Sequence, residues 1–227
     1  MSSPYIRRAT KADTESISHI CLLSANAGKS SINLHKFSEL PGVVWAEPYL
    51  NLPSGTGFVL IEPSSITDPG DGLDIEEGRV VGYTLVAFNT PSFERELESL
   101  WYPRWRKKYP IPFVPEPESH IPNPTEEDMK FINMIHHPKL ADKACLEFSP
   151  AHMHINILPE YQHKGWGKKL IGTMIKFLKE EKGVDAVWVR MDPRNLNARD
   201  FYQYVGYRPV EGADPLVHGL RFQDWVE

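Results

Sequence analysis

The sequence has few cysteines, no excess of basic residues and no long apolar run, and each of these absences excludes a class of protein. Two cysteines, Cys21 and Cys145, are too few for a disulfide framework or a thiolate metal cluster, so we expect both to be buried small side chains in a reducing compartment. The formal net charge of −5 argues against binding to duplex nucleic acid. No stretch approaches the roughly 18 consecutive apolar residues that a membrane-spanning helix needs.

What the sequence does contain is the composition of a folded chain. Hydrophobic residues make up 41% of the 227 residues, which is enough for a substantial core, and the length favours one large domain over two small ones. The first residues, MSSPYIRRATKAD, lack the apolar segment of a signal peptide. We therefore expect cytoplasmic or nuclear residence and no membrane partner, and the sequence leaves open whether the protein is a monomer or a homodimer.

Two segments interrupt the pattern of strands and helices. Prolines gather between Pro103 and Pro150, where each one removes a backbone donor and fixes φ, so this stretch is expected to form an ordered surface excursion. Residues 62–77 carry acids and turn formers but no Lys or Arg, which is typical of a solvated hairpin loop. The β-rich runs 57–62 and 79–89 flank this loop and predict an antiparallel pair.

Helix start signals are clear in three places. Thr10 with Asp13 forms a capping box that predicts a helix to about residue 24, after a short strand over 5–9. Thr90 as N-cap and Pro91 as first helical residue predict a second helix. Its apolar stripe comprises Phe93, Leu97, Leu100 and Trp101. A third helix is predicted from Thr125, ahead of Glu126, Glu127 and Asp128, to about His137. Together these predict a single domain over 1–227 with a helical, proline-rich insertion at about 91–150.

Residues 152–208 predict the order strand, glycine-containing loop, helix, strand, helix and strand. The first strand is HMHINIL, at 152–158, and the loop PEYQHKGWG follows it. The next helix is amphipathic and ends at Gly183. Its apolar face comprises Leu170, Ile171, Met174, Ile175 and Leu178. VDAVWVRM is the next strand, and a last helix over about 195–205 ends at Gly206. A loop of this kind between a strand and a helix is typical of an anion-binding site.

The glycine loop by itself predicts a site for a phosphate-bearing ligand. Its residues are Gln162, His163, Lys164, Gly165, Trp166, Gly167 and Lys168. Amides in the first turn of the following helix have no partner within that helix, and the helix dipole adds about half a positive charge. Lysines but no acids lie between Gln162 and Lys179. The alternative is a glycine turn beside a solvated lysine face. The loop fits neither the Walker A spacing nor the G-x-G-x-x-G dinucleotide pattern.

A second motif follows downstream. NLNARDFYQYVGY places Asn195, Ala198, Phe201 and Tyr202 on successive turns of the last helix. Together with Q-x-x-G-x-G at 162–167, it resembles the core motif of the GNAT superfamily of acetyl-CoA-dependent N-acetyltransferases. A narrower resemblance, from about Tyr5 to Pro209, is to the acetyltransferase-like domain associated with O-GlcNAcase. The superfamily resemblance implies the α/β GNAT (acyl-CoA N-acyltransferase) fold, with a mixed central sheet splayed at the cofactor site and helices on both faces.

The resemblance also implies roles for individual residues. Backbone groups of Ile155, Asn156 and Ile157 would bond the pantetheine arm of acetyl-CoA and polarise the acetyl carbonyl. The loop from Gln162 to Lys168 would hold the pyrophosphate through its amides, and Lys164, Lys168 and Lys169 would neutralise the phosphates. Asn195 would bond the pantetheine arm. Tyr202 would lie near the thioester sulfur as general acid, because a phenol can protonate a departing thiolate.

The base that would accept the proton of the amine is less well marked. In HMHINIL, alternation along a strand places His152, His154, Asn156 and Leu158 on one face. His154 is the candidate base, because its unperturbed pKa near 6.5 suits proton transfer. The alternative is a structural histidine with both ring nitrogens bonded. The O-GlcNAcase-associated resemblance would place an acid where this chain has Asn156, and an amide cannot act as a base.

The remaining histidine cluster does not predict a metal site. His136 and His137 precede a proline, and their spacing to His120 fits no common ligand pattern. We expect these residues to lie in loops.

The sequence therefore predicts an N-acetyltransferase in which an amine attacks acetyl-CoA directly, with no acyl-enzyme. The acceptor is an amino sugar or other small amine, or a protein lysine. Two alternatives stay open at this point. One is a catalytically weak or inactive acetyl-CoA-binding sensor or scaffold. The other is a nucleotide-binding protein that uses the same loop.

Overall fold

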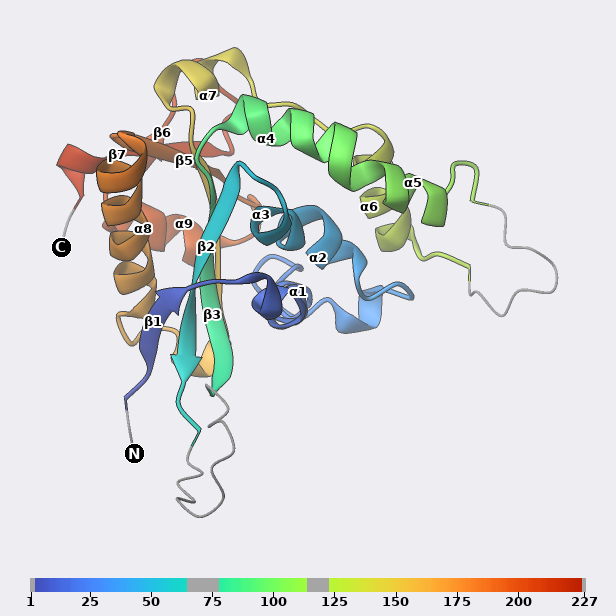
Figure 1. The fold of residues 1–227 in the computed structure, drawn as a ribbon, viewed down its shortest axis with the longest axis horizontal. Helices are drawn as coiled ribbons and strands as arrows, with labels where there is room; N and C mark the ends of the chain where they lie inside the picture. Colours follow the sequence, from blue (N-terminus) through green and yellow to red (C-terminus); the bar gives the residue numbers. More distant parts are fainter. Residues whose placement is uncertain (1–2, 65–77, 114–122, 226–227) are drawn as a thin grey trace.

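An open seven-stranded sheet forms the centre of the structure, a computed structural model that describes residues 3–64, 78–113 and 123–225 (Figure 1). The strand order is β1-β2-β3-β4-β5-β7-β6. Only the pairing of β4 with β5 is parallel. The strands are β1 (Tyr5–Arg8), β2 (Gly55–Glu62), β3 (Arg79–Ala87), β4 (His152–Ile157), β5 (Ala186–Arg190), β6 (Arg208–Pro209) and β7 (Val217–Arg221).

Helices cover both faces of this sheet, as the sequence predicted. The helices α1, α2 and α3 lie on one face, and α8 lies on the other (Figure 1). The helices are α1 (Thr14–Leu22), α2 (Leu40–Trp45), α3 (Glu47–Asn51), α4 (Thr90–Glu96), α5 (Tyr102–Lys108), α6 (Glu126–His136), α7 (Lys143–Phe148), α8 (Trp166–Lys182) and α9 (Leu196–Tyr204). None of the helices in the described ranges is both long and apolar enough to cross a membrane.

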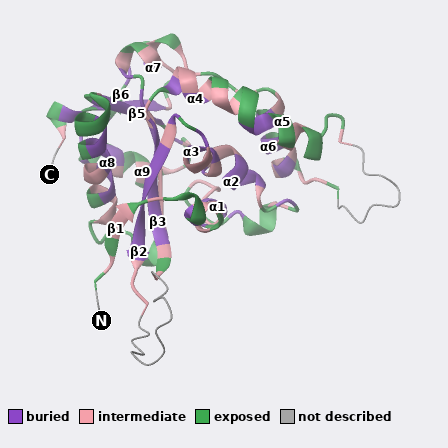
Figure 2. Cartoon of the chain, viewed as in Figure 1, coloured by how far each residue is buried: buried purple, intermediate pink, exposed green. Residues whose placement is uncertain are grey.

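The core lies between the sheet and these helices, and the strands β2, β3 and β5 are buried almost throughout (Figure 2). The predicted apolar face of α8 is buried in full. Cys21 and Cys145 are both free and fully buried, as predicted. Alternation along β3 separates the two layers: Thr84 faces Met174 of α8, whereas Tyr83, the residue before it, lies on the face of α1 to α3.

Several local predictions are confirmed. The β2–β3 pair is antiparallel, and the Thr10–Asp13 capping box is present, followed by a 3₁₀ turn and α1. The helix predicted to start at Thr125 is α6, and Thr125 and Asp128 form a capping box at its start. Gly183 ends α8 with φ +63° and Gly206 follows α9 with φ +105°, both in the left-handed region that glycine favours. Most of the acidic loop lies outside the described residues, as does His120.

The helix after β3 departs from its prediction in two ways. The N-cap is Asn89, whose side chain accepts from the amide of Ser92, so Thr90 is already helical and Pro91 is the second residue. Residues Leu97–Trp101 form a π-helical turn between α4 and α5. A π turn inserts an extra residue into the helix and rotates the apolar stripe. Leu100 is therefore 62% exposed, although the 3.6-residue period placed it in the core.

Some elements carried too weak a local signal to be predicted. The helices α2, α3 and α7 are short, and two of them begin beside prolines. Strand β7 was also missed, and it lies between β5 and β6 in the sheet, so the strand predicted at YRPV joins the sheet only at its edge.

A fully buried carboxylate connects α6 to the loop before α2. Asp128 accepts hydrogen bonds from the amides of Thr125 (2.9 Å) and Lys36 (3.0 Å), and its Oδ1 lies 2.9 Å from Nδ1 of His35. Burial alone would raise the pKa of Asp128, but these hydrogen bonds outweigh it and hold the pKa below its usual value. The ionised form is therefore part of the folded structure.

We predict that Asp128→Asn lowers the free energy of unfolding at pH 7 by about 2–3 kcal/mol, because the amide cannot accept all three bonds. Because the folded pKa is depressed, the contribution of Asp128 is present above the usual carboxyl pKa and is lost as pH falls through the folded value. The deficit of the variant should therefore shrink in acid. Urea midpoints across pH measure this, with Glu126→Gln, in the exposed first turn of the same helix, as control. Equal midpoints for Asp128→Asn and the unchanged chain at pH 7 would contradict the prediction.

Candidate functional site

Strand β4 pairs along its whole length with β3, but with β5 at one position alone. All six residues of β4 have partners on β3, whereas the parallel pairing with β5 is limited to His152 opposite Trp188. From Met153 to Ile157, the edge of β4 that faces away from β3 therefore forms no ladder with β5. The predicted splay of the sheet is present, and it exposes main-chain groups next to the glycine loop.

The loop after β4 presents unpaired amides at the start of α8. Gly165, with φ +80°, is the N-cap, and His163 also has a positive φ of +57°. Within the described residues, none of the amides from His163 to Lys168 donates to another group. Such amides, together with the positive end of the helix dipole, form a site suited to a phosphate.

Glycine is required at the two positions of the loop for different physical reasons. A Cβ added at Gly165 would meet nothing within 4 Å, so its backbone conformation is what requires glycine there. A Cβ at Gly167 would lie 2.9 Å from Cζ of Phe201. Gly167 therefore allows α9 to pack closely on the first turn of α8, which brings the two motifs found in the sequence together.

The predicted lysines surround this loop without carboxylate partners. The ammonium groups of Lys164, Lys168 and Lys169 lie over the rings of Tyr161, Tyr204 and Trp166, at 5.6, 5.9 and 4.2 Å from the ring centroids. None of the three forms an ion pair within the described part of the chain. Their ammonium groups are therefore available to an anionic ligand. Gln162 has a different contact, because its Nε2 donates to the carbonyl of Ile157 at 2.8 Å and so ties the loop to the end of β4.

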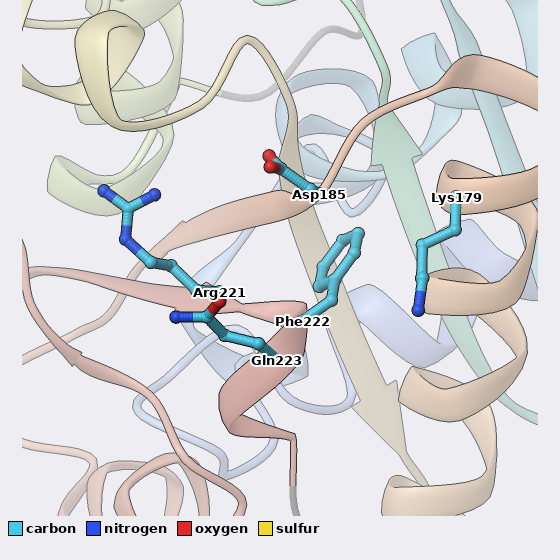
Figure 3. Close-up of a pocket in the computed structure, with 5 residues that line it drawn as sticks. All are labelled: Lys179, Asp185, Arg221, Phe222 and Gln223. Carbon is cyan, nitrogen blue, oxygen red and sulfur yellow. The ribbon is translucent and has the colours of Figure 1, made fainter.

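A hollow of about 660 Å³ runs along α8 from this loop. It is lined by Gly165, Lys168, Lys169, Gly172, Ile175, Lys176, Lys179, Glu180 and Trp225. A second hollow, of about 420 Å³, lies between α8, the start of β5 and the end of β7. Figure 3 shows the side chains that line it. Its lining comprises Lys179, Asp185, Arg221, Phe222 and Gln223, so it contains none of the loop residues.

On the opposite face of β4, His154 is held by bonds at both ring nitrogens. Its Nδ1 lies 2.6 Å from the carbonyl oxygen of Trp45, and its Nε2 lies 3.1 Å from Nδ2 of Asn156. A carbonyl can only accept, so Nδ1 carries the proton and Nε2 accepts from Asn156. Burial lowers the pKa of His154, against the smaller effect of the bond to Trp45. These contacts favour the structural alternative for His154 over the role of base.

The two predicted residues of α9 lie at its start and in its buried face. Asn195 is the N-cap, and its Oδ1 accepts from the amide of Ala198 at 3.1 Å. Tyr202 is 5% exposed and packs against Tyr207 with ring centroids 5.0 Å apart. Its hydroxyl makes no hydrogen bond within the described residues. Burial raises the pKa of Tyr202, so the phenol is protonated at neutral pH.

Sequence reasoning missed Trp45 and Tyr83, the partners of the β4 side chains. The Tyr83 hydroxyl accepts from Nδ2 of Asn156 at 2.7 Å. The register of β3 against β4 places Tyr83 opposite Asn156, and this could have been derived only after the strands had been aligned. Nothing in the sequence near Trp45 indicates its contact. Within the described ranges, no group of three or more His, Cys, Asp or Glu is placed to hold a metal.

The family model for the acetyltransferase (GNAT) family matches residues 95–207, the part of the chain that contains β4, the glycine loop, α8 and α9. This chain belongs to the GNAT acetyltransferase family. This GNAT chain is similar to the crystal structure of SsHAT, with a TM-score of 0.77 and 28% identity. The match covers 97% of this chain and 99% of the SsHAT chain. A GNAT-family acetyltransferase of Staphylococcus aureus Mu50 shares the fold, at a TM-score of 0.52 and 12% identity, over 97% of this chain and 99% of that one.

A curated relative matches a shorter stretch of this GNAT chain. It is the ribosomal protein bS18-alanine N-acetyltransferase of Haemophilus influenzae, 44% identical over 57 residues, which is 25% of the chain. The match spans 38% of the relative, well under half of its length.

We predict that Gly167→Ala destabilises the fold by about 1–3 kcal/mol, because the new Cβ overlaps Phe201. Gly172→Ala in the same helix is the matched control. Its Cβ would meet only Trp225, at 3.8 Å, and the better helix propensity of alanine should leave the chain as stable as before or more so. Thermal unfolding of the two variants measures the difference. Equal melting temperatures would show that the packing of α9 on α8 does not constrain the loop.

Proposed function

We propose that this GNAT chain is an acetyl-CoA-dependent N-acetyltransferase that transfers the acetyl group to an amine by direct attack. The single observation that carries the proposal is the set of unpaired amides from His163 to Lys168, which lies beside the parted edge of β4. Lysines without carboxylate partners border the same loop. A diphosphate fits these donors, and an extended arm fits the unpaired edge that leads from them.

Bound acetyl-CoA would supply the activated acetyl group, and the chain would supply binding, orientation and a proton. The loop amides would hold the diphosphate, and main-chain groups of Ile155 to Ile157 would orient the arm. Ile157 has less hydrogen-bonding capacity for the arm than we expected, because its carbonyl already accepts from Gln162. Asn195 would reach the arm through its Nδ2, because its Oδ1 caps α9.

Two observations support direct attack with Tyr202 as general acid. Burial raises the pKa of Cys21 to about 12, so this cysteine is a thiol, which is a poor nucleophile, at neutral pH. Tyr202 holds its proton at a hydroxyl that has no partner within the described residues, which leaves it free to donate. Tyr202 also lies on the helix that packs against the glycine loop. His154 stays in the proposal only as the candidate base, and its bonded Nε2 makes a water molecule the better assignment for that step.

The proposal names the acceptor only by its chemical class, an amine. Small amines, amino sugars and protein lysines remain the candidates, and the name of the Haemophilus relative adds the amino group of a protein alanine. The narrower resemblance to the O-GlcNAcase-associated domain stays a prediction, as do the single domain over 1–227 and its insertion at 91–150. An amine panel that includes glucosamine, a lysine peptide and an alanyl peptide covers these candidates.

We predict that acetyl-CoA raises the melting temperature of the chain and that Lys168→Glu weakens its binding roughly tenfold, about 1.4 kcal/mol. The cause is the lost attraction between the ammonium group and a phosphate. Isothermal titration measures the affinity, and Lys107→Glu on exposed α5 should leave it unchanged. Absence of heat and of thermal shift at millimolar acetyl-CoA would overturn the proposal. A larger shift with ATP than with acetyl-CoA would favour a nucleotide-binding protein instead.

We predict that Tyr202→Phe lowers kcat by about 10²-fold or more, as expected for loss of a general acid, with little change in the Kd for acetyl-CoA. Thiol release measures kcat, and Tyr204→Phe, two residues along the same helix but 69% exposed, is the control. Unaltered turnover in Tyr202→Phe would remove its assigned role. Binding of acetyl-CoA without thiol release from any amine would favour a sensor domain.

A further inference from the structure

A chain of polar contacts runs through the face of the sheet that carries α1 to α3. The Cys21 thiol donates to the carbonyl of Pro41 at 3.5 Å, and the thiol and the Tyr83 hydroxyl interact electrostatically. Tyr83 accepts from Asn156, which also donates to His154, and His154 donates to the carbonyl of Trp45. Both ends of the chain are backbone carbonyls of α2.

The backbone carbonyl of Trp45 fixes the direction of the bonds around Asn156. Because this carbonyl accepts from Nδ1 of His154, the neutral ring presents a lone pair at Nε2. An amide oxygen in place of Nδ2 would face this lone pair and be repelled. The orientation of the carboxamide therefore follows from its neighbours: Nδ2 points into the network, with one N–H for His154 and one for Tyr83.

This orientation leaves one polar atom of the network unused. Oδ1 of Asn156 makes no hydrogen bond within the described residues, and it is not among the fully buried polar atoms that lack a partner. Asn156 is itself only partly buried. Its oxygen is thus a hydrogen-bond acceptor that is held in place by its neighbours and keeps some exposed surface.

The position of Asn156 along β4 gives this acceptor a place in the reaction. Asn156 lies on the part of β4 that has parted from β5. Its side chain is on the face of α1 to α3, opposite the face that carries α8. A nucleophile that approaches the parted edge from this face would meet Oδ1 next to the backbone proposed to hold the acetyl arm.

We propose that Oδ1 of Asn156 binds the acceptor amine, by accepting one of its N–H groups, and that Tyr83 and His154 are positioning residues that hold the carboxamide in place. The inference rests on the proposed N-acetyltransferase function. It requires an acceptor amine that carries at least one N–H: this N–H bonds Oδ1 while the nitrogen lone pair is directed at the acetyl carbonyl. An amide oxygen at this point orients the amine but cannot remove its proton.

The test is steady-state kinetics with Asn156→Ala and the best amine found among glucosamine, a lysine peptide and an alanyl peptide. We expect the KM for the amine to rise roughly tenfold, with the KM for acetyl-CoA unchanged. Tyr83→Phe should raise the amine KM less, because it loosens the carboxamide without removing Oδ1. Asn133→Ala, at an exposed position of α6, is the control for a change of the same type.

The outcomes separate this inference from the function it rests on. If the unchanged enzyme acetylates an amine but Asn156→Ala leaves the amine KM as it was, the inference is wrong and the function stands. If the enzyme binds acetyl-CoA and acetylates no amine in the panel, the proposed function fails and the inference falls with it.

A measurement on the unchanged chain guards against a variant that does not fold. Nitrogen NMR of the histidine rings at pH 7 should find His154 neutral with its proton on Nδ1. A proton on Nε2 would require Oδ1 of Asn156 to face the ring, and would overturn the proposal without any substitution.

Discussion

The candidate site depends on β4 having a full partner on one side and almost none on the other. Main-chain N–H and C=O groups that lack partners are costly unless water or a ligand satisfies them. Pairing with β5 stops after His152, whose ring packs on Trp188 with centroids 4.9 Å apart and whose Nδ1 lies 2.7 Å from Oγ1 of Thr90. Burial lowers the pKa of His152 to about 3, so this junction is neutral at physiological pH. The parted edge is thus anchored at one end by apolar packing.

The two faces of β4 have different electrostatic character. On the side of α8, the loop offers amides, a helix N-terminus and lysines, although the chain as a whole is acidic. On the side of α1 to α3, the groups next to β4 are neutral: a phenol, an imidazole and a carboxamide joined by hydrogen bonds. The α8 side is therefore suited to an anionic ligand, and the side of α1 to α3 is suited to an uncharged one. This division follows from the alternation of side chains along a strand.

The neutral network also connects distant parts of the chain. His154 and Trp45 are separated by 109 positions in sequence, and their bond fixes α2 against the sheet. A buried polar network stabilises a unique arrangement when every member is bonded, and it is costly when one member is removed. Here the bonded members are fixed by carbonyls of α2, so the geometry near Asn156 depends on a helix that carries no motif of its own.

The sequence by itself determined the features that depend on neighbours along the chain. The capping box at Thr10, the helix start at Thr125, the apolar face of α8 and the glycine at its end are all encoded within a few residues, and each was predicted. The loop motif and the Asn195–Tyr202 motif were found in the same way. The partners of His154, the exposure of Leu100 and the place of β7 were decided by tertiary structure alone. Each of these depends on contacts between segments far apart in sequence, or on a π turn that shifts the helical period, and no local pattern specifies such contacts.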